Sequence, residues 1–88
     1  MIGTLPGGTT SYAGYISAAG EVVGESDVPG GETHAFILAK TAKMQDLNDL
    51  ISPGSGWVLN HASAMNLAGQ IVGFGTLNGA VHAFLLTP

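Results

Sequence analysis

The sequence contains no cysteine and very few charged side chains. The absence of cysteine from its 88 residues excludes a disulfide framework and a zinc site held by thiolates. Charged residues make up 9% of the chain, against about 25% in an ordinary globular domain. A chain with so few charges exposes much weakly polar surface, and such surface often serves as an interface.

Positive charge is the scarcest property of the chain. Lys40 and Lys43 are its only basic residues, and the formal net charge is −4. Without a basic patch to neutralise phosphates, neither nucleic acid nor an anionic membrane surface is an expected partner. No apolar run approaches the ~20 residues that a membrane-spanning helix needs. The N-terminal stretch "MIGTLPGG" also lacks the charged start and long apolar segment of a signal peptide.

One phrase occurs twice, as "HAFIL" at 34–38 and "HAFLL" at 82–86. The aligned pairs are Gly20 with Gly69, Gly24 with Gly73, His34 with His82 and Phe36 with Phe84. The shift is 49 residues for the glycines and 48 for the HAF phrases, a period typical of propeller blades and solenoid units. We predict a single domain of two repeats, at 6–50 and 51–88, with residues 1–5 as a closing strand.

Both repeats have the pattern of short strands separated by turn residues. The predicted strands are 12–17, 21–26, 33–39 and 43–47 in the first repeat, and 61–66, 70–75 and 81–87 in the second. Val, Ile, Phe and Tyr occupy the strand interiors, and Gly, Asn and Pro mark the joins. No segment shows sustained helical periodicity. The pattern predicts an all-β fold.

The predicted strands are apolar on both faces, so each sheet needs cover on both sides. With no helices to supply it, we predict two four-stranded antiparallel blades of the propeller type, with a small β-sandwich as the alternative. The second repeat stops before its fourth strand, and residues 2–5 align with 47–50. We therefore expect a neighbouring chain to supply that strand and to help close a ring. A homo-oligomer follows, with a trimer favoured and a tetramer next.

The repeated motifs resemble the HAF repeat family of bacterial proteins. Its signature combines an "IN-x-x-G-Q-V-V-G" segment with "HAF" and "M-x-DL". The matching residues are 16–24, 34–36 and 44–47 in the first repeat, and 65–73 and 82–84 in the second. Ser17 and Glu21 depart from the usual Asn and Gln. The resemblance implies the two C-terminal repeats of such a protein, a propeller-like build, an extracellular or cell-surface location and no known catalytic site.

His34 and His82 occupy equivalent positions within predicted strands. They could form a ring of imidazoles that binds a metal or another ligand. Alternatively, each is a half-buried histidine bonded to neighbouring backbone or to Ser17 and Asn66. We favour the structural role because buried polar groups need hydrogen-bond partners wherever they occur. The repeated glycines and phenylalanines are assigned the same packing role.

Four other residues are candidates for ligand binding: Trp57, His61, Asp27 and Glu32. Trp57 follows the loop "SPGSG", where it could stack on a sugar, anchor an interface or form a lid over the core. Asp27 and Glu32 flank the loop at 28–31, but no calcium-loop motif accompanies them and the spacing fixes no geometry. We expect solvated acids here, and neither a metal nor a cofactor.

The predicted function is that of a non-catalytic binding or scaffold module rather than an enzyme. Its ligand would be a carbohydrate or a protein that meets the loops at 27–32 and 52–57. One alternative is a hydrolase or lyase that uses loop carboxylates and His61. Another is a purely structural fragment of a longer propeller.

Overall fold

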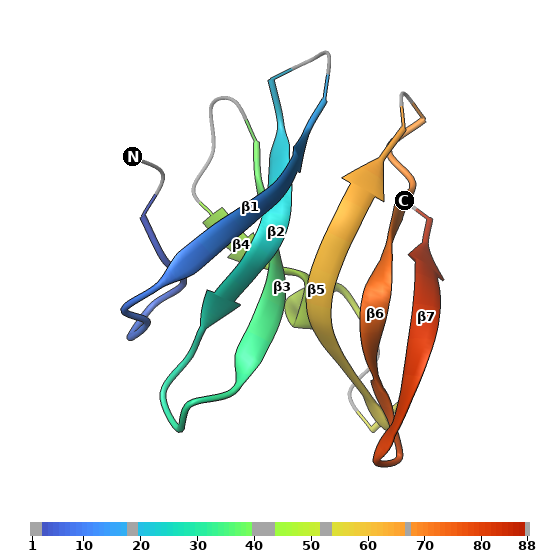
Figure 1. Ribbon diagram of the computed structural model, residues 1–88. Helices are drawn as coiled ribbons and strands as arrows, with labels where there is room; N and C mark the ends of the chain where they lie inside the picture. Colours follow the sequence, from blue (N-terminus) through green and yellow to red (C-terminus); the bar gives the residue numbers. More distant parts are fainter. Residues whose placement is uncertain (1–2, 18–19, 40–43, 52–53, 67, 88) are drawn as a thin grey trace.

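The computed structural model describes residues 3–17, 20–39, 44–51, 54–66 and 68–87, and strands dominate it (Figure 1). The elements are β1 (Ser11–Ile16), β2 (Val22–Asp27), β3 (Thr33–Leu38), β4 (Met44–Asp46), the 3-10 helix η1 (Leu47–Leu50), β5 (Trp57–Met65), β6 (Ile71–Leu77) and β7 (Ala80–Leu86). The all-β prediction is confirmed. Within the described residues, no helix is long and apolar enough to cross a membrane.

The strands form two antiparallel sheets, each in simple sequence order. The first sheet has the order β1-β2-β3-β4 and the second β5-β6-β7. The predicted strands are found within one or two residues, except that β5 begins at Trp57, four residues before the expected start. The turn between β6 and β7 has positive φ angles at Asn78 (52°) and Gly79 (87°). Two such angles define the type I′ turn that Asn-Gly favours in hairpins.

The N-terminal segment differs from the expected closing strand. The residues with which it was aligned, 47–50, form the 3-10 helix η1 and not a strand. Residues 3–5 form no strand either, while residues 1–2 lie outside the described part of the chain. Leu5 is 2% exposed, and its N–H donates to Ser26 Oγ at 2.9 Å. This segment therefore packs on the first sheet of its own chain, and the second sheet has three strands, not the four expected of each blade.

The two sheets repeat each other's register, including an irregularity. Pairing of β1 with β2 is interrupted between Ala13 and Tyr15, and pairing of β5 with β6 is interrupted at the equivalent place, between Ala62 and Ala64. An extra residue at such a point is a β-bulge, which bends the strand and strengthens its twist.

Glycine is required beside each bulge. A Cβ atom on Gly24 would collide with the carbonyl oxygen of Tyr12, and one on Gly73 would collide with that of His61. Because these four residues are two equivalent pairs, the paired glycines predicted to be structural serve the same close approach of backbones in both sheets.

Each sheet has two faces, which we name after the HAF phrase. The Phe face of the first sheet carries Val22, Ser26, His34 and Phe36, and its Ala face carries Val23, Glu25, Ala35 and Ile37. The Phe face of the second sheet carries Ile71, His82, Phe84 and Leu86, and its Ala face carries Val72, Phe74, Ala83 and Leu85. Neighbouring strands place these sets together because side chains alternate along a strand.

The main core lies between the Ala face of the first sheet and the Phe face of the second. Val23 and Ala35 share one cluster with Ile71, Phe84 and Leu86. Strand β5 crosses β1, β2 and β3, so it forms the contact between the sheets (Figure 1). Each sheet thus covers one apolar face of the other.

The two outer faces differ in how far they are covered. Figure 1 shows the N-terminal segment on the side of the first sheet opposite the second sheet, and Phe36 on that Phe face is 0% exposed. The Ala face of the second sheet has no such cover among the described residues. There Val72 is 43% exposed, Phe74 46% and Leu85 60%. The fold thus leaves one apolar sheet face open.

Candidate functional site

The four candidate ligand residues lie at separate points of the fold. Asp27 ends β2, Glu32 lies exposed in the β2–β3 loop, Trp57 begins β5 and His61 lies in the middle of β5. In the part of the chain that the structure describes, no three His, Asp or Glu side chains converge as metal ligands would. The structure therefore does not gather these residues into a single site.

Asp27 holds the N-terminal segment against the end of β2. Its carboxylate accepts hydrogen bonds from Thr10 N at 2.8 Å, from Thr9 Oγ1 at 2.7 Å and from Thr9 N at 2.7 Å. These bonds, above all the one from the Thr10 N–H, hold the pKa of Asp27 below its ordinary value of 3.8. Asp27 therefore connects the N-terminal segment to the end of β2 and is not a free loop acid.

His61 joins the two sheets. Its Nδ1 lies 2.8 Å from Glu25 Oε1 on β2, where the carboxylate accepts the hydrogen bond. The two side chains are 22% and 25% exposed. The imidazole also stacks on Phe74, with ring centroids 5.2 Å apart and an interplanar angle of 29°. No sequence pattern indicates this pairing, because the partners are 36 residues apart and meet only when the sheets pack.

Trp57 packs inward, as a lid over the edge of the core. Its ring meets Phe84 edge-on at 6.5 Å and His82 at 6.1 Å. It also lines a cavity of about 370 Å³, together with Asn48, Asp49, Ile51, Gly54, Ser55 and Gly56. The half-buried ring leaves only its outer part available to a ligand.

His34 and His82 have different surroundings despite their equivalent positions. His34 Nδ1 lies 2.6 Å from Asp46 Oδ2 on β4, and both side chains are about one-fifth exposed, at 22% and 19%. His82 is exposed and contacts Trp57. His34 is half-buried and bonds to Asp46 rather than to Ser17, whereas His82 is exposed and not half-buried.

The residues expected to hold these histidines instead close two equivalent turns. Ser17 Oγ accepts from Glu21 N at 3.1 Å, and Asn66 Oδ1 accepts from Gln70 N at 3.0 Å. Gly20 and Gly69 complete the turns with φ angles of 85° and 82°. Such positive values explain why glycine recurs there.

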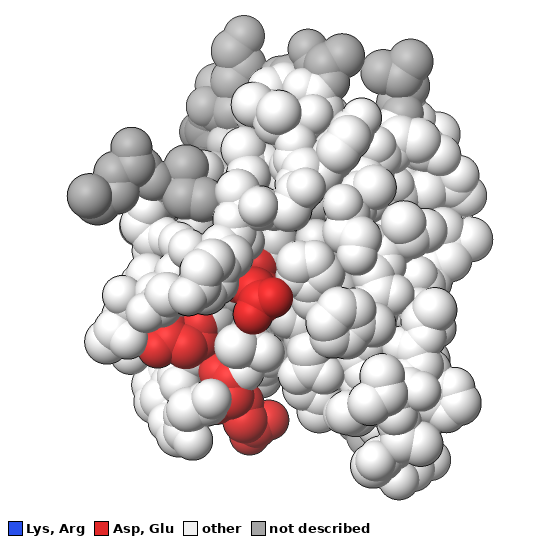
Figure 2. Space-filling view, viewed as in Figure 1, with Lys and Arg blue, Asp and Glu red and all other residues white. Residues whose placement is uncertain are grey.

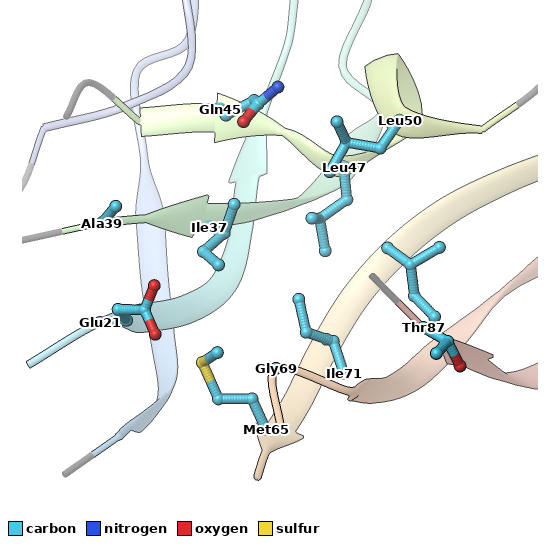
Figure 3. Close-up of a pocket in the computed structure, with 11 residues that line it drawn as sticks. Glu21, Ile37, Ala39, Gln45, Leu47, Leu50, Met65, Gly69, Ile71 and Thr87 are labelled. Atoms are coloured by element: carbon cyan, nitrogen blue, oxygen red, sulfur yellow. The ribbon is translucent and has the colours of Figure 1, made fainter. Parts of the chain in front are cut away.

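A cavity of about 480 Å³ opens between the sheets at the end opposite Trp57. Figure 3 shows Ile37 and Leu47 pointing from the first-sheet side toward Met65 and Ile71 on the second-sheet side, with Glu21 at the margin. The volume falls within the range of small-molecule sites, and the lining is mostly apolar. It offers space for an apolar group but no converging set of reactive side chains among the described residues.

No protein-family model, curated protein or solved structure matches the chain. The geometry described above is therefore the basis for any functional conclusion.

Proposed function

We propose that the chain is a non-catalytic scaffold and binding module that assembles with copies of itself. The observation that carries this proposal is that acidic and histidine side chains form hydrogen bonds that hold parts of the fold together. Asp27 clasps the N-terminal segment, Glu25 and His61 join the sheets, and His34 pairs with Asp46. Each of these groups has a hydrogen-bond partner that belongs to the fold, which supports a structural role.

Assembly is supported by the open Ala face of the second sheet. Contiguous apolar surface of this kind marks interaction sites in proteins. A ring of propeller-type blades built by three chains, or by four as the next choice, would bury such faces in every subunit. The mass in solution tests this part of the proposal. A particle of one chain at micromolar concentration would refute assembly.

The ligand region proposed for the module is the end of the sheets that carries the β2–β3 loop. Figure 1 shows this loop at the same end as the β6–β7 turn. Trp57 also begins its strand there, beside the loop cavity of about 370 Å³. A carbohydrate stacked on the outer part of the Trp57 ring, or a protein seated over the loop, are the ligand chemistries that fit.

The single tryptophan makes the ligand proposal easy to test. Fluorescence of Trp57 should shift and saturate when a carbohydrate ligand is titrated from a panel of neutral oligosaccharides. A Trp57→Phe variant, followed by calorimetry, provides the control. If no member of the panel changes the emission, the carbohydrate part of the proposal is refuted and a protein ligand is favoured.

The resemblance to HAF repeats supports a propeller-type build and an extracellular or cell-surface location, and both stay predictions. The hydrolase or lyase alternative depends on the Glu25–His61 pair, which could transfer a proton if a substrate reached it. Removing either side chain would then abolish turnover of a glycoside or ester substrate. A purely structural fragment would show neither assembly nor ligand binding.

A further inference from the structure

Residues 50–88 contain no Asp, Glu, Lys or Arg. Every Asp, Glu and Lys lies between residues 21 and 49. Figure 2 accordingly shows the acidic side chains over the first sheet and none over the second. Depletion of charge is a property of the cores of protein interfaces. The open Ala face lies on this uncharged sheet.

The repeat indicates what covers such a face. The equivalent pairs are Val23 and Val72, Ala35 and Ala83, and Ile37 and Leu85. In the first sheet, Val23 and Ala35 are both 0% exposed because β5 packs across them. In the second sheet, Val72 is 43% exposed. A strand that packs across the Ala face, as β5 does on the first sheet, would therefore cover the exposed residues of the second sheet.

Among the described strands, β1 is the one equivalent to β5 in the repeat. The equivalent pairs are Tyr12 and His61, Ala13 and Ala62, and Ile16 and Met65. Met65 is 7% exposed in the contact between the sheets, whereas Ile16 is 64% exposed. Tyr12 is also 64% exposed, so β1 presents apolar side chains with no described cover.

The two open surfaces complement each other at one further position. Within the chain, His61 of β5 bonds to Glu25 of the first sheet. The residues equivalent to this pair are Tyr12 on β1 and Phe74 on the second sheet. An aromatic pair thus stands where the internal contact has a histidine and a carboxylate. Aromatic side chains stabilise interfaces by area and by ring geometry, without the need to desolvate a charge.

We infer that β1 of one copy of this chain packs across the Ala face of the second sheet of another copy, head to tail. The inference rests on the proposed assembly and names its interface. Tyr12 and Ile16 form one side, and Val72, Phe74 and Leu85 form the other. These five account for all but three of the large hydrophobic residues that the described chain exposes, the others being Tyr15, Leu50 and Val81.

The N-terminal segment fits this interface. In the internal contact, the chain before β5 contributes Leu47, which lies in the core between the sheets. The chain before β1 places Leu5 on the Phe face of the first sheet in the corresponding way. The segment therefore occupies the place of a linker in the interface and does not block it.

A head-to-tail contact differs from a two-fold contact because each chain carries two unlike surfaces. Ile16→Asp blocks the β1 surface only, and Leu85→Asp blocks the second-sheet surface only. Both side chains are at least 60% exposed in the single chain, so folding should be retained. Leu50→Asp, at a residue 52% exposed outside both surfaces, is the matched control.

The experiment is sedimentation velocity on the whole chain, with circular dichroism to verify folding. Each blocking variant alone should associate at least about tenfold more weakly than the parent chain, because a charge is buried at the contact. An equimolar mixture of the two variants should form a 1:1 complex and nothing larger, since one intact surface of each kind remains. The control variant should assemble like the parent.

Three results would overturn the inference in distinguishable ways. A parent chain that stays monomeric refutes assembly itself, together with this interface. Assembly unaffected by Ile16→Asp and Leu85→Asp leaves the scaffold proposal standing and refutes the surfaces named here. Two blocked variants that fail to combine when mixed refute the head-to-tail arrangement.

Discussion

His61 on β5 and Glu25 on β2 connect the two sheets through a 2.8 Å contact between ring nitrogen and carboxylate oxygen. The pair lies at the border of the core, with about a quarter or less of each side chain exposed. The two repeats differ in chemistry here, since the equivalent residues are Tyr12 and Phe74. The internal contact between the sheets therefore includes one polar contact beside its apolar core.

Removing the tie should loosen the packing of one sheet on the other. Glu25→Ala and His61→Ala should each lower the free energy of unfolding, and the double-mutant cycle should yield a coupling of about 0.5–1.5 kcal/mol. Urea unfolding at one fixed protein concentration measures it, because assembly adds to apparent stability. The exposed acid Glu32 is the control, and Glu32→Ala should show no coupling to His61→Ala. Zero coupling between Glu25 and His61 would mean that the contact contributes nothing.

The contribution of Asp27 to stability should depend on pH. Its folded pKa lies below the ordinary 3.8, so its contribution to stability is fully present above that value. It is lost as the pH falls through the lowered folded pKa. Asp27→Asn should therefore have a lower Tm than the parent at pH 7, and the difference should shrink below about pH 3.8. Glu32→Gln, at an exposed loop residue, should match the parent at both pH values. A constant gap across pH would assign the effect to the amide and not to the charge.

Much of the fold could be predicted from the sequence because its signals are local. Apolar strand interiors and turn residues placed the strands. The equivalent glycines Gly20 and Gly69 lie in two similar turns, both with positive φ. Gly24 and Gly73 allow neighbouring strands of the same sheet to approach closely, whereas the sequence suggested a close approach of neighbouring sheets.

The contacts between segments could not be predicted, because they depend on geometry that no short pattern encodes. His34 bonds to Asp46 through the register of β3 with β4, not to the nearby Ser17. The segment at 47–50 has the composition of a strand end but winds into a 3-10 turn, with Asp46 accepting from Asn48 N. The alignment of residues 2–5 with this segment therefore gives no support for a closing strand, and residues 3–5 form none.

Variants at Trp57 test whether its ring covers the edge of the core or serves only to bind a ligand. If the ring serves as a lid, Trp57→Ala should lower the free energy of unfolding by about 2 kcal/mol, somewhat less than the 3–5 kcal/mol typical of a fully buried aromatic. Trp57→Phe should recover most of the loss because it keeps an aromatic edge near Phe84. Circular dichroism must follow unfolding, since the only tryptophan has been removed. Unchanged stability in Trp57→Ala would indicate that the ring belongs to a ligand surface alone.

The paired glycines provide the most direct test of the structural repeat. Gly24→Ala and Gly73→Ala should each destabilise the chain by about 1–3 kcal/mol, because the added methyl group meets a main-chain carbonyl oxygen that cannot turn away without breaking the strand pairing. Gly54→Ala is the matched control. Its Cβ would meet nothing within 4 Å, and its φ of 80° carries only the conformational penalty of about 1 kcal/mol.

Chemical denaturation of the three variants, compared with the parent, measures the differences. The two sheet variants should lose similar amounts, since the atoms that the new methyl groups would meet are equivalent in the two repeats. A loss at Gly24 without one at Gly73 would show that the second sheet relaxes where the first cannot. The bulge would then be a rigid feature of the four-stranded sheet alone, and its recurrence in sequence would need a cause other than the shared close approach of the strands.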